Sequence, residues 1–416
     1  MIKKRLMTCL LFLACIFMIV SYSVLADEQE EVIKIGAIYP LTGSVASLGI
    51  NCQRGAMFAV DEINSEGGIL GKKVVIEYGD STGDPKIGMS EAERLITQKD
   101  VCALFGCYQS AVTNVVSQVA QKYKVPMITA ISTADTITSK GYDYFFRLSP
   151  TNMMYLRDMV QLIIDYNEKY GTNMIRAAVM AENTLNGQET AKWAKYWGEQ
   201  LGLEMIDEIM YSHNAADLTS EVLTLKSDDP DIVFIDPYIS DAILLMKTMH
   251  EQQFKPKIIV AKASGVIDPD FLPAVGEQGY GISTCVEWSE DFGKGTEISK
   301  AFEERFGVAM NGHSAEVYTA VWVLKTAIEK AGGPDTVKIQ SNLDKMKIQE
   351  EFPDGGPIII LPYNTIEFSN IEMGGNTHTN QNTYARVSIA QILDGKYKTI
   401  WPFNVAVTEM QIPVWE

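Results

Sequence analysis

The feature that most constrains the fold is a regular alternation of short apolar runs with segments of amphipathic helical spacing. In the first part of the chain, apolar runs at 33–38, 74–78, 101–105 and 126–130 alternate with helical patterns at 49–63, 85–97 and 110–123. Runs that are apolar throughout, separated by amphipathic helices, are typical of parallel strands that are covered by helices on both faces. The pattern therefore predicts an α/β unit with a parallel sheet.

The same pattern restarts after Arg147. Helical spacing at 151–168, 187–201, 217–227 and 240–252 alternates with apolar runs at 176–180, 205–211, 231–235 and 257–261. Two more helical patterns follow at 297–306 and 315–331, and the chain beyond Pro357 reads as strands. A chain of 416 residues is long enough for two domains with full cores. We predict two α/β units of similar size.

The N-terminus has the pattern of a secretory signal peptide. Three basic residues, Lys3 to Arg5, precede an apolar run over 7–20, and small side chains at Val24 and Ala26 precede Asp27. This pattern predicts cleavage after Ala26 and a periplasmic or otherwise extracytoplasmic protein. The alternative is a membrane anchor, but the run is shorter than the roughly 20 residues that a span needs.

Charge and motifs exclude several function classes. The formal net charge of −18 makes nucleic acid a poor partner. The sequence contains no G-x-S-x-G elbow, H-E-x-x-H, P-loop or G-x-G-x-x-G motif, so no catalytic residue, cofactor or enzyme activity is expected. His378 lies in "GGNTHTNQN" (374–382), which we interpret as a surface loop rather than a metal site.

Four cysteines would remain after cleavage, and none is in a C-x-x-C motif: Cys52, Cys102, Cys107 and Cys285. An exported protein can form disulfides. Four cysteines allow three complete pairings, and the sequence does not choose among these and free thiols. No metal site is expected.

The stretch "GCYQS" (106–110) is a polar turn between a predicted strand and a predicted helix. Ligands of open parallel sheets bind beyond the carboxyl ends of the strands. The unpaired N–H groups of a helix start, with a hydroxyl beside them, favour an anionic or carbonyl group. Ser110 is therefore a candidate ligand contact, and the alternative is a simple helix cap.

Several phrases resemble the branched-chain amino-acid (Leu/Ile/Val) type of periplasmic solute-binding protein of ABC transporters. They are "IKIGAIYPLTGSVASLG" (33–49), "GAMFAVDEINSEGGILGKKVVIEYGDSTGDP" (55–85), "GCYQS" (106–110), "VPMITAISTADTITSKGYDYFFRLSP" (125–150) and "SAEVYTAVWVLKTAIEKAG" (314–332). The resemblance implies a type I periplasmic binding protein fold, with two Rossmann-like lobes joined by three hinge crossovers. It places lobe 1 at 27–149 and 286–355, and lobe 2 at 150–285 and 356–416. The crossovers would lie near 148–151, 284–289 and 360–366.

The resemblance also implies ligand-binding residues. In lobe 1, Ser110, Ser132 and Thr133 would receive a ligand carboxylate, and Ser47 and Leu48 would line the side-chain pocket. Leu48 stands where the family often has an aromatic residue, which indicates a pocket of different shape. Tyr108 and Gln109 fill that space, or Tyr108 only covers the edge of the core.

In lobe 2, the resemblance implies contacts from Asn186, Asp236, Tyr238 and Ser264. Ser264 stands where the family has an acidic partner for the ligand's ammonium. A buried ammonium without a carboxylate is costly. Either Asp236 takes over that role or the ligand has no ammonium, while an Asp before Pro237 is also common in plain turns.

The leading functional hypothesis is a monomeric receptor that delivers a small polar organic solute to the membrane permease of an ABC importer. The ligand would be an amino acid, an amide or a small aromatic carboxylate. The alternative is an extracytoplasmic sensor subunit that reports to a signalling protein.

Overall fold

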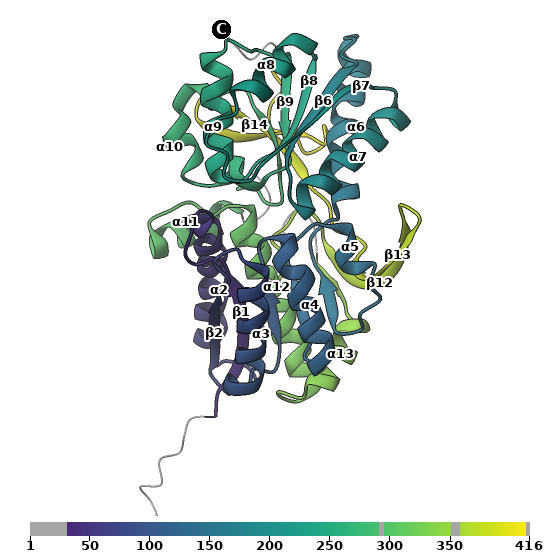
Figure 1. Ribbon diagram of the computed structural model, residues 1–416. Helices are drawn as coiled ribbons and strands as arrows, with labels where there is room; N and C mark the ends of the chain where they lie inside the picture. Colours follow the sequence, from purple (N-terminus) through teal and green to yellow (C-terminus); the bar gives the residue numbers. More distant parts are fainter. Residues whose placement is uncertain (1–30, 291–294, 351–357, 413–416) are drawn as a thin grey trace, which may run out of the picture.

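The computed structural model describes residues 31–290, 295–350 and 358–412, which form two lobes stacked end to end (Figure 1). The predicted signal peptide lies outside the described residues. Within them, no helix is long and apolar enough to cross a membrane.

Lobe 1 is built on an eight-stranded sheet. Its strand order is β11 (Lys347–Gln349), β12 (Thr365–Met373), β13 (Asn376–Asn382), β5 (Phe145–Arg147), β4 (Met127–Thr129), β3 (Leu104–Gly106), β1 (Ile33–Tyr39) and β2 (Val74–Asp80). The strands β5 to β2 are parallel, as their apolar sequences predict, whereas β11 and β13 pair antiparallel with β12.

The helices of lobe 1 are α2 (Ala46–Ser65), α3 (Pro85–Lys99), α4 (Ser110–Tyr123), α5 (Asp135–Thr138), α11 (Gly295–Phe306), α12 (Gly312–Ala331) and α13 (Thr336–Asp344). α2 packs closely on α12, because Gly55 has no Cβ: a Cβ there would lie 2.2 Å from the carbonyl oxygen of Ser314. The segment after 294 thereby returns to the first lobe.

Lobe 2 is built on a seven-stranded sheet with the order β15 (Lys396–Trp401), β14 (Ser388–Leu393), β10 (Ser283–Val286), β9 (Ile258–Ala261), β8 (Ile232–Asp236), β6 (Arg176–Glu182) and β7 (Glu204–Tyr211). Its helices are α6 (Asn152–Tyr170), α7 (Leu185–Leu201), α8 (Thr219–Asp228), α9 (Ile239–Glu251) and α10 (Phe271–Val275), with the short turns η1 (Ser264–Ile267) and η2 (Gly276–Gly279). The strands β10, β9, β8, β6 and β7 are parallel to one another. β14 pairs antiparallel with β10, and β15 pairs antiparallel with β14.

The chain passes between the lobes at 148–151, after β10, and between β13 and β14. The first two places agree with the expected crossovers. The third does not: residues 365–382 belong to the sheet of lobe 1, and the chain crosses at 383–387 rather than near 360–366. The reason for this difference is the way in which the last four strands pair. β12 and β13 form a hairpin that extends the first sheet beyond β5, and only β14 and β15 reach lobe 2.

This hairpin also corrects the interpretation of 374–382 as a surface loop. Gly374 and Gly375 make the turn, and β13 runs from Asn376 to Asn382. His378 is buried, with its ring nitrogens near Thr138 Oγ1 and the carbonyl oxygen of Met373.

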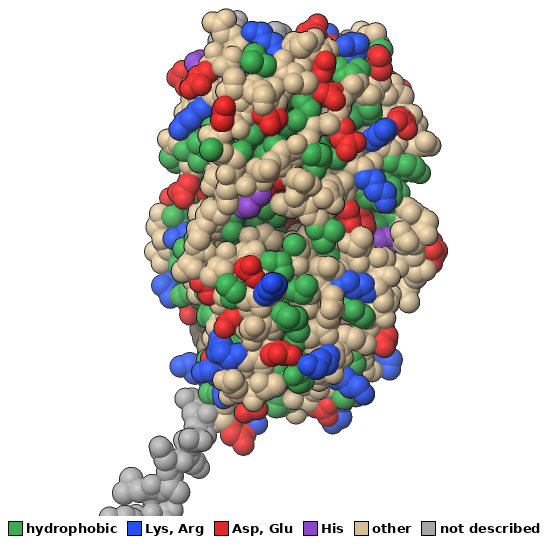
Figure 2. Space-filling model, viewed as in Figure 1, with side chains coloured by type: hydrophobic (Ala, Val, Ile, Leu, Met, Phe, Trp, Pro, Cys, Tyr) green, Lys and Arg blue, Asp and Glu red, His purple; other side chains and the backbone are tan. Residues whose placement is uncertain are grey.

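The outer surface carries acidic and basic side chains mixed over both lobes (Figure 2). The interior of each lobe follows the apolar pattern of the sequence: Ile35 in β1 and Phe234 in β8, for example, have no exposed surface. The carboxyl ends of the parallel strands in both lobes carry residues that meet between the lobes, and this is where polar residues gather.

Candidate functional site

A small cavity of about 30 Å³ lies between the lobes. It has room for about one water molecule as the lobes stand. Its lining comes from both lobes and the connecting segments: Tyr108, Ser110, Ile131, Thr133, Tyr155, Asn186, Asp236, Tyr238, Lys262, Ala263, Ser264, Glu287 and His313. Seven of the eleven residues that the sequence suggested are in this set.

The lobe 1 wall is the start of α4 with the turn after β4. The N-cap of α4 is Gln109, whose side chain makes no capping hydrogen bond, and Ser110 is the first helical residue. Ser110 is therefore not the cap, and its Oγ accepts a hydrogen bond from the backbone N–H of Ala134. A helix start without a side-chain cap keeps N–H groups and a partial positive charge for a polar ligand group.

The centre of the site is held by Lys262, which the sequence analysis missed. It directly follows β9, its side chain is 4% exposed, and its Nζ forms an ion pair with Asp236 Oδ2 at 2.9 Å. The ammonium also donates toward Asn152, Asn186, Thr190 and Thr133. The signal that could have found it is its place at the carboxyl end of a strand, two residues before Ser264.

Two of these contacts connect the lobes. Thr133 of lobe 1 donates its hydroxyl to Asn186 Oδ1 of lobe 2 at 2.8 Å, and it accepts from Lys262 at 3.2 Å. Asn186 in turn donates to Asp236 Oδ2 at 2.7 Å. Thr133, Asn186 and Asp236, which the sequence suggested separately, thus belong to one hydrogen-bond network.

The wall near the connecting segments is acidic. Tyr155 in α6 donates its hydroxyl to Glu287 Oε1 at 2.5 Å. Burial raises the pKa of the Glu287 carboxyl to about 7, so at neutral pH the group is present in both protonation states. Oε2 of Glu287 and Oδ1 of Asp236 are both buried and have no hydrogen-bond partner among the described residues.

A group of aromatic side chains lines one side of the cavity. The ring of Tyr108 lies 5.1 Å from that of His313, edge to face, and 5.9 Å from that of Tyr238. Burial lowers the pKa of His313 to about 3, so this histidine is neutral at physiological pH. Ser264 of lobe 2 lines the same cavity as Tyr108. Tyr108 lines the cavity and also packs in the core.

Four predicted residues lie away from the cavity lining. Leu48 is fully buried in the core, because α2 begins at Ala46 rather than at 49 and turns this side chain inward. The expected pocket role of Leu48 is thus corrected. Ser47 is half-buried in the first turn of α2. The hydroxyl of Ser132 is engaged by Thr113 and by the carbonyl oxygens of Cys107 and Tyr108, so its role is to hold the turn.

The fourth of these residues, Gln109, borders a second hollow of about 300 Å³ at the rim of the cleft. Residues of both lobes line this hollow, among them Gly83, Asn186 and His213. Across it, Asn214 Nδ2 donates to Ser44 Oγ at 3.0 Å. The rim hollow and the cavity share Ser110, Asn186 and Tyr238 in their linings.

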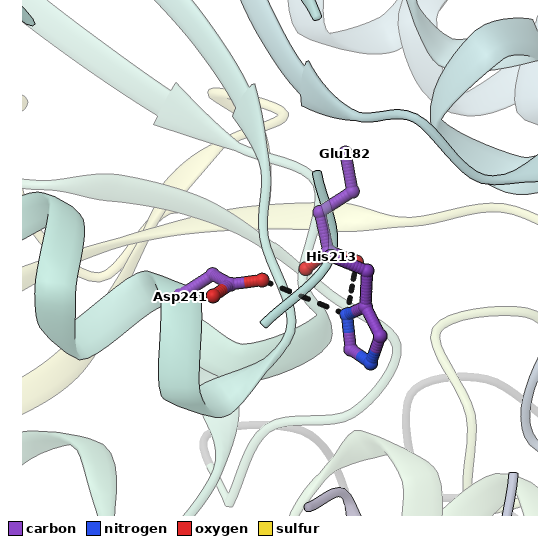
Figure 3. Close-up of side chains that lie close together, drawn as sticks. All are labelled: Glu182, His213 and Asp241. Carbon is purple, nitrogen blue, oxygen red and sulfur yellow. Dashed lines mark hydrogen bonds and ion pairs between the residues drawn. The ribbon is translucent and has the colours of Figure 1, made fainter. Parts of the chain in front are cut away.

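A cluster of Glu182, His213 and Asp241 lies beside this rim (Figure 3). His213 Nδ1 is 2.8 Å from Glu182 Oε2 and 3.6 Å from Asp241 Oδ2. Hydrogen bonding to Asp241 and Glu182 raises the pKa of the imidazole to about 9. The other carboxylate oxygens accept from backbone N–H groups of Tyr238 and Ala215. The arrangement is explained by an imidazolium between two carboxylates.

The chain resembles known proteins over most of its length. The chain matches the family described as periplasmic binding protein over residues 32–391. A Leu/Ile/Val-binding protein homolog 7 of Brucella suis biovar 1 is 29% identical over 398 residues, which cover 92% of this chain and 94% of the relative.

Two solved structures share the fold. The branched-chain amino acid transporter substrate binding protein LivJ of Streptococcus pneumoniae, in complex with isoleucine, has a TM-score of 0.74 at 21% identity and covers 92% of this chain and 100% of that one. A solute binding protein of an ABC transporter of Rhodopseudomonas palustris, in complex with 3,4-dihydroxy benzoic acid, has a TM-score of 0.73 at 20% identity, with coverages of 88% and 95%.

These likenesses confirm the type I periplasmic binding protein fold that the sequence predicted. The matched family is one of periplasmic solute-binding proteins, which implies a location outside the cytoplasm. Because the match spans most of the chain, the protein belongs to the periplasmic binding protein family.

Proposed function

We propose that this protein is the substrate-binding component of an ABC importer and takes a small polar organic solute into the cleft between its lobes. The ligand class is an amino acid, an amide or a small aromatic carboxylate. The observation that carries the proposal is that polar groups without hydrogen-bond partners lie on both sides of the cavity. The uncapped start of α4 offers N–H donors on one side, and the buried Asp236 Oδ1 and Glu287 Oε2 offer acceptors on the other.

Binding would be coupled to closure of the lobes. The groups that line the cavity come from both lobes, so a solute completes its hydrogen bonds only when the lobes approach each other. Three connecting segments allow such a hinge motion, and a ligand that contacts both lobes stabilises the closed form. The closed form is the shape that a permease would recognise. A cleavable signal peptide over 1–26 is part of this proposal, and the exported protein would begin at Asp27.

The first test is a thermal-shift screen of the purified protein against amino acids, amides, ureas and small aromatic acids. A ligand that binds only the native state raises the melting temperature as its concentration exceeds Kd. We expect a response to at least one of these classes without any turnover of the compound. A protein that responds to none of them, while melting cooperatively, contradicts the proposed ligand class.

The importer role is tested with the transporter itself. When the permease and ATPase are reconstituted in lipid, the liganded protein should stimulate ATP hydrolysis more than the ligand-free protein does. Stimulation of a purified signalling kinase instead would assign the protein to sensing.

A further inference from the structure

Lys262 places its own ammonium in a cage of oxygen atoms between the lobes. The Nζ atom lies 2.6 Å from Asn152 Oδ1, 2.9 Å from Asn186 Oδ1, 2.9 Å from Asp236 Oδ2, 3.1 Å from Thr190 Oγ1 and 3.2 Å from Thr133 Oγ1. The face of the Tyr155 ring lies 5.7 Å from the same atom. An ammonium has only three N–H donors, so five oxygens and an aromatic face form a complete cation site.

The backbone after Lys262 holds it there. Ala263 and Ser264 follow with φ of 49° and 54°, a conformation that residues other than glycine rarely adopt. Two such residues in succession persist only where surrounding contacts enforce them, and they are concentrated at ligand sites. Here the lysine cage and the backbone hydrogen bonds of Lys262 to Ile235 and of Gly265 to Pro237 supply those contacts.

We propose that Lys262 permanently fills the cleft's ammonium subsite, so that the protein selects net-neutral solutes that lack an amino group and carry N–H donors beside a carbonyl oxygen, as amides and ureas do. The solute class rests on the proposed function, whereas the filled subsite does not. A second ammonium would compete with Lys262 for Asp236 and would be repelled by it at this short range.

The groups that remain unused match such a solute. Asp236 Oδ1 and Glu287 Oε2 belong to residues that are 3% and 2% exposed, and both require a donor. An amide or urea N–H₂ supplies one, whereas a ligand carboxylate has no N–H to donate and would lie beside the Asp236 carboxylate. The carbonyl oxygen of the solute would accept from the uncapped N–H groups at the start of α4.

Chemical rescue tests the filled subsite without knowledge of the ligand. In Lys262→Ala the cage loses its occupant, and methylammonium should bind there. We expect about 100 mM methylammonium chloride to raise the melting temperature of this variant by at least about 2 °C relative to sodium chloride. Wild type and Lys262→Met should not respond, because a side chain still fills the cage. Lys257→Ala, at an exposed lysine that pairs with Asp231, is the matched control.

A folded Lys262→Ala protein that responds to methylammonium no more than Lys262→Met does would overturn the filled subsite. If Lys262→Ala does not fold, thermal shifts of the wild-type protein with small solutes test the inference instead. Thermal shifts with acetamide or urea, and none with glycine or alanine, support the inference, whereas shifts with glycine or alanine and none with amides overturn it. Rescue by methylammonium in a protein that responds to no solute at all would keep the subsite and reject the proposed function.

Discussion

The ammonium of Lys262 lies 2.9 Å from one carboxylate oxygen of Asp236, and both side chains are more than nine-tenths buried. Asp236 ends β8 and Lys262 directly follows the neighbouring parallel strand β9, so the sheet itself sets their separation. The pair is therefore a fixed charge arrangement in the middle of the cleft, which shapes stability as well as ligand choice.

Removing one member of this pair should be costly. In Lys262→Met the Asp236 carboxylate stays buried without its cation, and we expect a loss of about 3–5 kcal/mol in the free energy of unfolding. The double variant Lys262→Met, Asp236→Asn should recover part of that loss, because no unpaired charge is left. Thermal unfolding of wild type, both single variants and the double variant measures the coupling. Strictly additive losses would contradict a coupled pair.

His213 should give the protein a pH-dependent stability. Its folded pKa of about 9 is above its usual value of 6.5, so the stabilisation is complete below pH 6.5 and is lost as pH rises through 9. Relative to wild type, His213→Gln should show a smaller fall of melting temperature between pH 6.5 and pH 9. Exposed His250, in the last turn of α9, provides the control His250→Gln. Parallel curves for wild type and His213→Gln would contradict the raised pKa.

The described cysteines should be inert in the native protein. Cys52, Cys102, Cys107 and Cys285 are free and buried, and burial raises the pKa of each thiol, to about 12 for Cys102. Because the thiolate is the reactive form, a thiol reagent should label these four groups only after denaturation. Fast labelling of the folded protein, or four groups that stay unreactive in denaturant without reductant, would be inconsistent with four buried free thiols.

Gly265→Ala should disturb the lobe 2 side of the cleft. A Cβ at this position would lie 2.5 Å from the backbone of Tyr238 and Ile239, at the start of α9. The backbone has to move, and we expect destabilisation of about 1–3 kcal/mol together with weaker ligand binding, since Tyr238 lines the cavity. Gly202→Ala is a useful comparison, because no atom lies within 4 Å of its Cβ, although its φ of 92° adds local strain. Equal ligand affinity of Gly265→Ala and wild type would show that this turn does not position Tyr238.

Local patterns in the sequence were enough to predict the two parallel sheets. β1, β8 and α4 are visible as apolar runs and helical spacing, and the strand-end rule then leads to Ser110, whereas Asp236 and Tyr238 were suggested by the family resemblance. The position of β12 and β13 was not predictable in this way. The two strands belong to lobe 1 because β13 pairs with β5, which lies more than 200 residues away in sequence.

The sequence prediction missed Lys262 and placed Leu48 wrongly, for different physical reasons. The oxygens around Lys262 come from elements spread over Thr133 to Asp236, and no local pattern shows that they converge on one lysine. For Leu48 the error was the helix start: three residues' difference at the N-terminus of α2 changes which face a side chain takes.

The most direct test of the account is a calorimetric titration of the best ligand from the screen into wild type and into the Ser110→Ala, Thr133→Ala double variant. Ser90→Ala with Thr97→Ala, on the exposed face of α3, is the matched control. The account predicts that the cleft variant binds about 100-fold more weakly or not at all, while the control binds like wild type. Unchanged affinity in the cleft variant would contradict the assignment of the interlobe cavity as the solute site.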